Sequence, residues 1–230
     1  MKALLLAAGL GTRLRPVTDT LPKCLVPIKG RPLLDYWLEM LTEAGVGPIL
    51  LNLHYLPHRV QEYMETSRYR KNVELVYEEV LLGTGGTILA NRDFFGADSS
   101  FLVIHADNYS LFDVRAFIEQ HILRPPECEI TMLTFSTDVP NSCGIVELDD
   151  RGVVVGFHEK VQNPPGNLAN GAVYIFEKSI MDAIVNMNKS NIDISTEILP
   201  RYINAIWTYY NNNIHIDIGT LSNLTIAQTL

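Results

Sequence analysis

The chain has 230 residues, of which 47% are hydrophobic and 19% are charged, so it can bury a large core, in one large domain rather than two small ones. Its net charge of −8 argues against a nucleic-acid partner, because duplex binding requires a broad basic face. Three cysteines without Cys-x-x-Cys spacing give no sign of a disulfide framework or a structural zinc site, and no apolar stretch approaches the ~20 residues that span a bilayer. We therefore expect a cytoplasmic protein without a membrane partner.

A basic stretch with two glycines lies at the start of the chain. The apolar run 4–8 predicts a buried strand that ends at Gly9 and Gly11, and Arg13, Arg15 and Lys23 follow. Residues 1–31 carry six lysine or arginine side chains and a single acidic one. The exposed backbone amides of a glycine turn, next to a cluster of positively charged side chains, favour the binding of a polyphosphate ligand. The stretch lacks the Gly-Lys-Ser/Thr ending of a P-loop and the third glycine of the dinucleotide fingerprint, which disfavours both of those sites.

Strand and helix patterns alternate along the first part of the chain. The spacing of apolar residues predicts a helix that ends before Gly45, a strand over 48–53, a helix over 57–67 and a strand over 73–77. Such alternation favours an α/β fold of the three-layer, doubly wound Rossmann-like type, with a mainly parallel mixed sheet. Sheets of this type bind ligands outside the carboxyl ends of their strands.

A second glycine-rich segment follows the strand over 73–77. Gly83, Gly85 and Gly86 fall within four positions, ahead of a helix expected over 88–91. Glycines so closely spaced cost chain entropy unless the backbone passes close to a flat or anionic group. A plain surface loop is the alternative interpretation.

Two aspartates each follow an apolar run, Asp107 after residues 101–106 and Asp217 after residues 214–216. An unpaired buried carboxylate costs several kcal/mol, so we expect each of them to face a cation. Further elements are expected between and after these residues: helices over 112–123, 179–187, 195–203 and 220–230, strands over 129–135, 143–148, 153–157 and 170–176, and a hairpin turn over 149–152.

These motifs resemble the sugar-1-phosphate nucleotidylyltransferases, whose hallmark is a strand followed by G-x-G-T-R-L-x-P and a downstream P-K pair. The resemblance extends over nearly the whole chain. It implies one domain over 1–230, with a nucleotide-binding part over about 1–110, an acceptor-binding part over about 111–230 and no C-terminal β-helix. Among subgroups, the first loop looks most like bacterial mannose- or heptose-phosphate guanylyltransferases, while uridylyl and thymidylyl transfer stay open.

The resemblance also implies roles for individual residues. The catalytic cations would be Arg13 for the triphosphate and Lys23 for the α-phosphate, and Asp107 and Asp217 would bind Mg²⁺. The residues expected at the nucleotide are Leu6, Ala7, Ala8, Gly9, Gly11, Thr12, Arg13, Glu79, Gly83, Thr84, Gly85 and Ala106. The residues expected at the acceptor are Gly144, Glu159, Lys160, Asn170 and Gly171. Two positions depart from the family pattern: Ala106 precedes the first aspartate, and Ile214 or His215 stands where relatives have tryptophan.

The implied reaction combines a nucleoside triphosphate with a sugar 1-phosphate to give a nucleotide sugar and pyrophosphate. Two alternatives stay open. The acceptor could be a non-sugar phosphate, as in a cytidylyltransferase acting on phosphocholine, or the chain could be a non-catalytic nucleotide-binding subunit. Homo-oligomer formation is equally open.

Overall fold

The computed structural model describes all residues, 1–230, as two compact units that interleave along the chain. The first unit consists of residues 1–81, 104–114 and 213–230, and the second consists of 82–103 and 115–212. The chain therefore leaves the first unit twice and returns to it twice. The division into a nucleotide-binding and an acceptor-binding part stays a prediction.

The first unit contains a parallel sheet. Strand β4 (Ile49–Leu53) lies between β1 (Ala3–Leu6) and β5 (Val73–Tyr77), and all three run in the same direction. The other neighbour of β1 is β6 (Ser100–His105), whose last residues belong to this unit. The register pairs Asn52 of β4 with both Leu6 of β1 and Val76 of β5, so the three strands end at the same edge.

Helix α1 (Leu33–Glu43) buries one apolar face in the core of this unit, and the side chains on that face are Leu33, Leu34, Trp37, Leu38 and Leu41. The helix ends before Gly45, which adopts a left-handed conformation, as the spacing predicts. Helix α2 (Pro57–Thr66) also agrees with the expected range.

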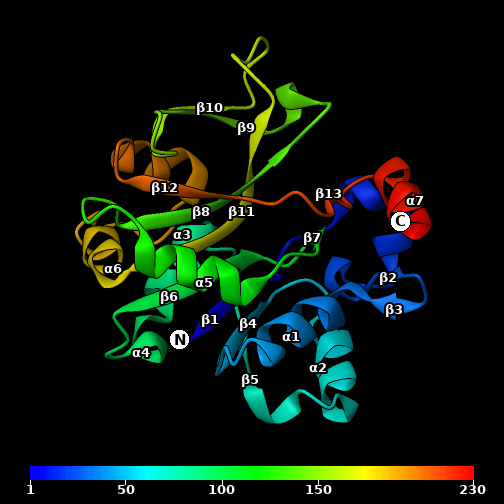
Figure 1. Ribbon diagram of the computed structural model, residues 1–230. Helices are drawn as coiled ribbons and strands as arrows, with labels where there is room; N and C mark the ends of the chain where they lie inside the picture. Colours follow the sequence, from blue (N-terminus) through cyan, green and yellow to red (C-terminus); the bar gives the residue numbers. More distant parts are fainter. The chain divides into compact units, whose positions relative to one another are not determined.

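The C-terminal helix α7 (Leu221–Thr229) docks on a small hairpin, β2 (Pro27–Ile28) and β3 (Arg31–Pro32), that follows the Pro22-Lys23 pair (Figure 1). The Gln228 amide accepts a hydrogen bond from the Lys29 backbone and donates one to the Pro27 carbonyl, both at 2.6 Å.

The second unit holds the antiparallel part of the fold. Its strand order is β10–β9–β11–β6, and β8 pairs with β11 on one side and with β12, in parallel, on the other. The strands are β8 (Ile130–Ser136), β9 (Gly144–Leu148), β10 (Val154–Glu159), β11 (Leu168–Glu177) and β12 (Ile206–Tyr210). The predicted hairpin over 149–152 joins β9 and β10, and β12 was not expected from the sequence.

The helices of the second unit agree with the sequence in part. Helices α5 (Val114–Leu123) and α6 (Lys178–Val185) lie close to the expected ranges, and α4 (Arg92–Phe95) is a short addition. The helix expected over 195–203 is instead a π-helical turn (Ile194–Ile198) followed by a 3-10 turn (Leu199–Tyr202), because Pro200 cannot donate to a helical ladder.

The α/β class with a mixed, mostly parallel central sheet and flanking helices is confirmed, and the antiparallel pairs β8–β11, β9–β10 and β9–β11 of that sheet lie in the second unit. No helix combines the length and the apolar character that a bilayer crossing needs.

Candidate active site

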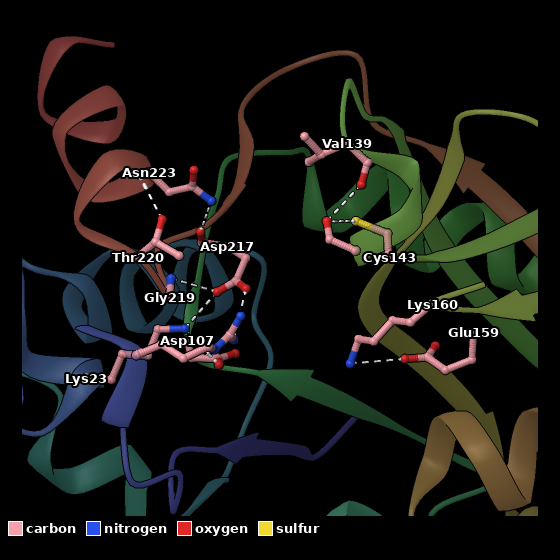
Figure 2. A network of polar contacts seen from close by, with 12 residues as sticks. Lys23, Asp107, Val139, Cys143, Glu159, Lys160, Asp217, Gly219, Thr220 and Asn223 are labelled. Carbon is pink, nitrogen blue, oxygen red and sulfur yellow. Dashed lines mark hydrogen bonds and ion pairs between the residues drawn. The ribbon is translucent and has the colours of Figure 1, made fainter. Parts of the chain in front are cut away.

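Lys23 lies at the centre of a charged cluster in the first unit (Figure 2). Its Nζ donates to Asp107 Oδ2 at 2.9 Å and to Asp217 Oδ1 at 2.7 Å. Only 8% of the Lys23 side chain is exposed, and the two carboxylates offset the cost of burying its ammonium group. We call Arg13, Lys23, Asp107 and Asp217 the Lys23 cluster. The structure thus brings together the four residues for which the sequence predicts phosphate and metal binding.

A short strand pair explains why two aspartates far apart in the chain meet. Strand β7 (Asn108–Ser110) follows Asp107 directly and pairs antiparallel with β13 (His215–Asp217). The register places Asp217 opposite Asn108, beside Asp107. The sequence indicates the two carboxylates but not this ladder, because three residues are too few for a strand pattern.

Arg13 approaches Asp217 from the first glycine loop. Its Nη2 lies 3.4 Å from Asp217 Oδ2, and most of the side chain is exposed. The short 3-10 turn that carries it (Thr12–Leu14) follows Gly11, which adopts a left-handed φ of +63°. A Cβ on Gly11 would lie 3.0 Å from the Thr18 methyl group, and the Thr18 hydroxyl donates to the Gly11 carbonyl at 2.7 Å. Glycine at this position is therefore needed to aim Arg13.

The charge state of Asp107 reflects two opposing effects. Burial raises the pKa of this carboxyl, but the charge and hydrogen bond of Lys23 outweigh it, so the pKa lies below its usual value. Asp107 is consequently ionised at neutral pH.

Asp217 is held from several sides (Figure 2). The Gly219 amide donates to Oδ1 at 2.8 Å, and Asn223 Nδ2 donates to the Asp217 carbonyl at 2.7 Å. A Cβ on Gly219 would lie 2.9 Å from Arg13 Nη2, so this glycine leaves room for the arginine.

The remaining predicted nucleotide-binding residues of the first unit lie where the chain leaves the sheet. Ala106 donates to the Leu6 carbonyl at 3.0 Å, and Ala7 donates to the Asn52 side chain at 2.7 Å. Ala8 is buried, whereas Gly9 borders open space, since a Cβ there would meet no atom within 4 Å. Thr12 begins the turn that carries Arg13.

Glu79, the predicted contributor to the base pocket, is exposed, while its neighbour Glu78 is buried and accepts from Asn52. Sequence reasoning missed Asn52 and Glu78. A polar residue inside the apolar run 49–53 is the signal that could have identified Asn52.

The glycine-rich segment of the second unit is packed against its own chain. Helix α3 (Gly83–Ala90) begins at Gly83 rather than at the expected residue 88. A Cβ on Gly83 would lie 2.5 Å from the Ile192 carbonyl, and the Gly85 amide donates to that same oxygen at 2.8 Å. The Thr84 hydroxyl accepts from the Ile194 amide at 2.8 Å. Close approach of the segment around Ile192 thus gives these glycines a structural reason that the sequence did not indicate.

The residues predicted to contact the acceptor form a second group in the same unit. Gly144 and Glu159 are direct partners across strands β9 and β10. A Cβ on Gly144 would lie 2.6 Å from Glu159 Oε2 and 2.7 Å from the Phe157 ring, so the carboxylate lies across the glycine. Lys160 pairs with Glu159 at 3.2 Å and is 66% exposed (Figure 2). We call Gly144, Glu159 and Lys160 the Glu159 group.

Asn170 and Gly171 lie at an irregularity in β11. The pairing with β8 shifts between Asn170 and Tyr174, and Ala172 has a positive φ of +53°. The Asn170 side chain stabilises this bulge, because Nδ2 donates to the Tyr174 hydroxyl at 2.7 Å and Oδ1 accepts from the Ala172 amide at 2.9 Å.

The donor set of the Lys23 cluster fits a hard divalent cation. Two carboxylates from distant segments converge on one cation, the Lys23 ammonium, and residues 1–230 contain no group of three or more His, Cys, Asp or Glu side chains that could hold a metal ion. Mg²⁺ typically takes one or two carboxylates and completes its shell with waters and substrate phosphates.

Comparisons with known proteins identify the family of the chain. Residues 2–230 match the profile of the family described as nucleotidyl transferase. A glucose-1-phosphate thymidylyltransferase from Streptomyces griseus is 34% identical over 83% of the chain and 53% of its own length. A mannose-1-phosphate guanyltransferase from Schizosaccharomyces pombe is 33% identical over 89% and 56%, respectively. The chain thus spans little more than half the length of these curated relatives.

A solved structure extends the likeness to nearly every residue. HddC from Yersinia pseudotuberculosis, complexed with GMP-PN, superposes with a TM-score of 0.82 at 27% identity, over 99% of this chain and 98% of that one. The chain belongs to the nucleotidyl transferase family.

Proposed function

We propose that the chain transfers a nucleoside monophosphate from a nucleoside triphosphate to a sugar 1-phosphate, releasing pyrophosphate. The observation that carries the proposal is the Lys23 ammonium held between Asp107 and Asp217 in a chain whose family members include sugar-1-phosphate guanylyl and thymidylyl transferases. The bond that forms joins an acceptor phosphate oxygen to the α-phosphorus. The bond that breaks joins that phosphorus to the bridging oxygen, which leaves with its electron pair as part of pyrophosphate.

Fixed positive charge supplies most of the catalysis in this proposal. The acceptor phosphate is already an anionic nucleophile at neutral pH, so the reaction needs no general base. The difficulty is to bring two anions together and to stabilise charge on the α-phosphate, which positioned cations do well. Lys23 serves the α-phosphate, Arg13 the departing pyrophosphate and Lys160 the acceptor phosphate.

Asp107 and Asp217 are the residues that would hold Mg²⁺. When bound, the metal neutralises charge on the phosphate oxygens. The ionised state of Asp107 and the anchoring of Asp217 by the Gly219 amide prepare both carboxylates for that role. Lys23 keeps the pair together before any ligand arrives.

The test is product formation by the purified chain. GTP, UTP, dTTP and CTP are each combined with Mg²⁺ and with mannose 1-phosphate, glucose 1-phosphate or phosphocholine, and mass spectrometry detects the product while pyrophosphate release is measured. GTP comes first, because the structurally similar HddC was solved with GMP-PN. A nucleotide sugar supports the proposal. A product from CTP and phosphocholine alone would assign a cytidylyltransferase, and nucleotide binding without pyrophosphate release would assign a non-catalytic subunit.

A further inference from the structure

Two polar side chains are buried at the carboxyl edge of the parallel sheet in the first unit. Asn52 lies at the end of β4 and is 2% exposed, and Glu78 follows β5 and is 5% exposed. Burying an amide and a carboxylate is costly unless both make hydrogen bonds. Their position therefore calls for an explanation beyond packing.

The two side chains form a relay that ends on the first glycine loop. Ala7 donates its backbone N–H to Asn52 Oδ1 at 2.7 Å, and Asn52 Nδ2 donates to Glu78 Oε1 at 3.0 Å. The Glu78 backbone is anchored in turn, because its N–H donates to the Leu53 carbonyl at 2.8 Å. The relay thus runs from the residue after β5, through β4, to the residue that follows β1.

The orientation of the Asn52 amide is fixed by its neighbours. An amide turned by 180° would point its NH₂ group at the Ala7 N–H and its oxygen at the Glu78 carboxylate, so both contacts would become repulsive. Glu78 therefore ensures that Asn52 presents an acceptor to Ala7.

We propose that Asn52 is a positioning residue for the nucleotide loop, residues 7–13, and that Glu78 orients its amide. The inference rests on the proposed function. In parallel β1–β4 pairing Asn52 is opposite Leu6, so its side chain adds one further hydrogen bond to the ladder beyond the last strand residue. That bond sets the point at which the loop departs toward Gly9, Gly11 and Arg13, whose aim at the phosphates depends on it.

Four variants and one matched control test the relay. N52L keeps the approximate shape of the side chain and removes both polar contacts. N52D faces the Glu78 carboxylate with a second buried carboxylate, whereas E78Q keeps the acceptor without the charge. The double variant N52D/E78Q reverses the polarity of the second bond, because the amide introduced at position 78 can donate to an aspartate that still accepts from Ala7. The control is N72L, since Asn72 donates to the Val46 carbonyl at the amino ends of the same two strands.

Two readouts are used, hydrogen exchange of the Ala7 amide by NMR and the dissociation constant for GTP, UTP or dTTP with Mg²⁺ by calorimetry. Losing one buried hydrogen bond of about 1 kcal/mol corresponds to roughly a fivefold change. We expect N52L to accelerate Ala7 exchange and to weaken nucleotide binding by at least that factor, N52D to do so more strongly, and N52D/E78Q to recover most of the loss. E78Q alone should change both readouts least of the four, and N72L should leave them unchanged.

The inference is overturned if Ala7 exchange in N52L equals that of the parent chain, or if the double variant binds no better than N52D. A parent chain that binds none of the nucleotides refutes the proposed function and the loop's role with it, whereas unaltered Ala7 exchange in a chain that does bind refutes the relay alone.

Discussion

The Lys23 cluster and the Glu159 group each pair a lysine with acidic side chains, but the two lysines differ in burial and in where their partners lie in the chain. Lys23 is almost fully buried and holds two carboxylates that the β7–β13 ladder brings together. Lys160 is largely exposed, and its partner is the adjacent residue in the chain. Buried ion pairs and the ladder therefore constrain the first arrangement, whereas the exposed Lys160 is less constrained. We infer that the Lys23 cluster governs the chemical step and that the Glu159 group governs affinity for the acceptor.

Asp107→Asn should cause the largest loss of turnover among the substitutions considered. The change removes one of the two charges that Lys23 balances and one carboxylate that would hold Mg²⁺, which is worth several kcal/mol, so turnover should fall by more than about 1,000-fold. Circular dichroism should show an intact fold. Unchanged turnover under saturating Mg²⁺ would refute the metal assignment.

Lys23→Ala should come next, with a loss of about 100-fold in kcat and a smaller change in nucleotide affinity. The physical reason is that a fixed ammonium stabilises charge that develops on the α-phosphate. Single-turnover kinetics and calorimetry separate the two quantities. If affinity alone fell, Lys23 would only anchor the bound nucleotide.

Lys160→Ala should act differently from Lys23→Ala, although both substitutions replace a lysine by alanine. We expect the KM for the acceptor to rise about tenfold with kcat nearly unchanged, since an exposed lysine contributes mainly to binding. Arg201→Ala is a suitable control, because Arg201 is an exposed cation at the surface of the same unit. A fall in kcat as large as that of Lys23→Ala would erase the distinction between the two regions.

Gly144→Ala should have a milder effect, a rise of a few-fold in the acceptor KM. The added methyl group would displace the Glu159 carboxylate, whose end is flexible, and would press on the Phe157 ring. Steady-state kinetics with varied acceptor measure the change. Gly166→Ala is the matched control, because a Cβ there meets open space. Equal KM values for Gly144→Ala and the control would separate Glu159 from acceptor binding.

Lowering the pH should reduce the stability of the fold. Turnover at neutral pH should be affected less by this titration than by any of the substitutions above. Burial, aided by the Arg124 charge, lowers the pKa of His121 to about 4 from an ordinary 6.5. The unfolded chain therefore binds an additional proton between pH 6.5 and 4, and the free energy of unfolding should fall by about 2–3 kcal/mol as the pH drops through that window. Urea titrations check this. In His121→Gln the slope over this window should become shallower, and an identical slope would mean that other groups are responsible.

Much of the first unit can be predicted because its signals are local. The strands around residues 48–53 and 73–77 and the helix that ends before Gly45 depend on apolar periodicity within single segments. The cations and aspartates of the Lys23 cluster could be named for the same reason, since each follows directly from a strand or a motif.

What the sequence could not reveal depends on contacts between distant segments. The β7–β13 ladder, the Asn52–Glu78 pair and the packing of Gly83 against Ile192 each involve residues whose partners lie far away in the chain. A periodicity analysis sees the glycines of the second segment as a ligand loop, because it has no access to the backbone that actually approaches them.

The interleaving of the two units has a consequence for the order in which the protein is made. Lys23 and Asp217 are 194 residues apart, and the whole second unit is synthesised between them. At translation rates of about 5–20 residues per second, roughly 10–40 s pass before the second carboxylate leaves the ribosome. Once Asp107 has been made, a nascent chain holds Arg13, Lys23 and Asp107 without Asp217, so the second unit can fold while the Lys23 cluster is still incomplete.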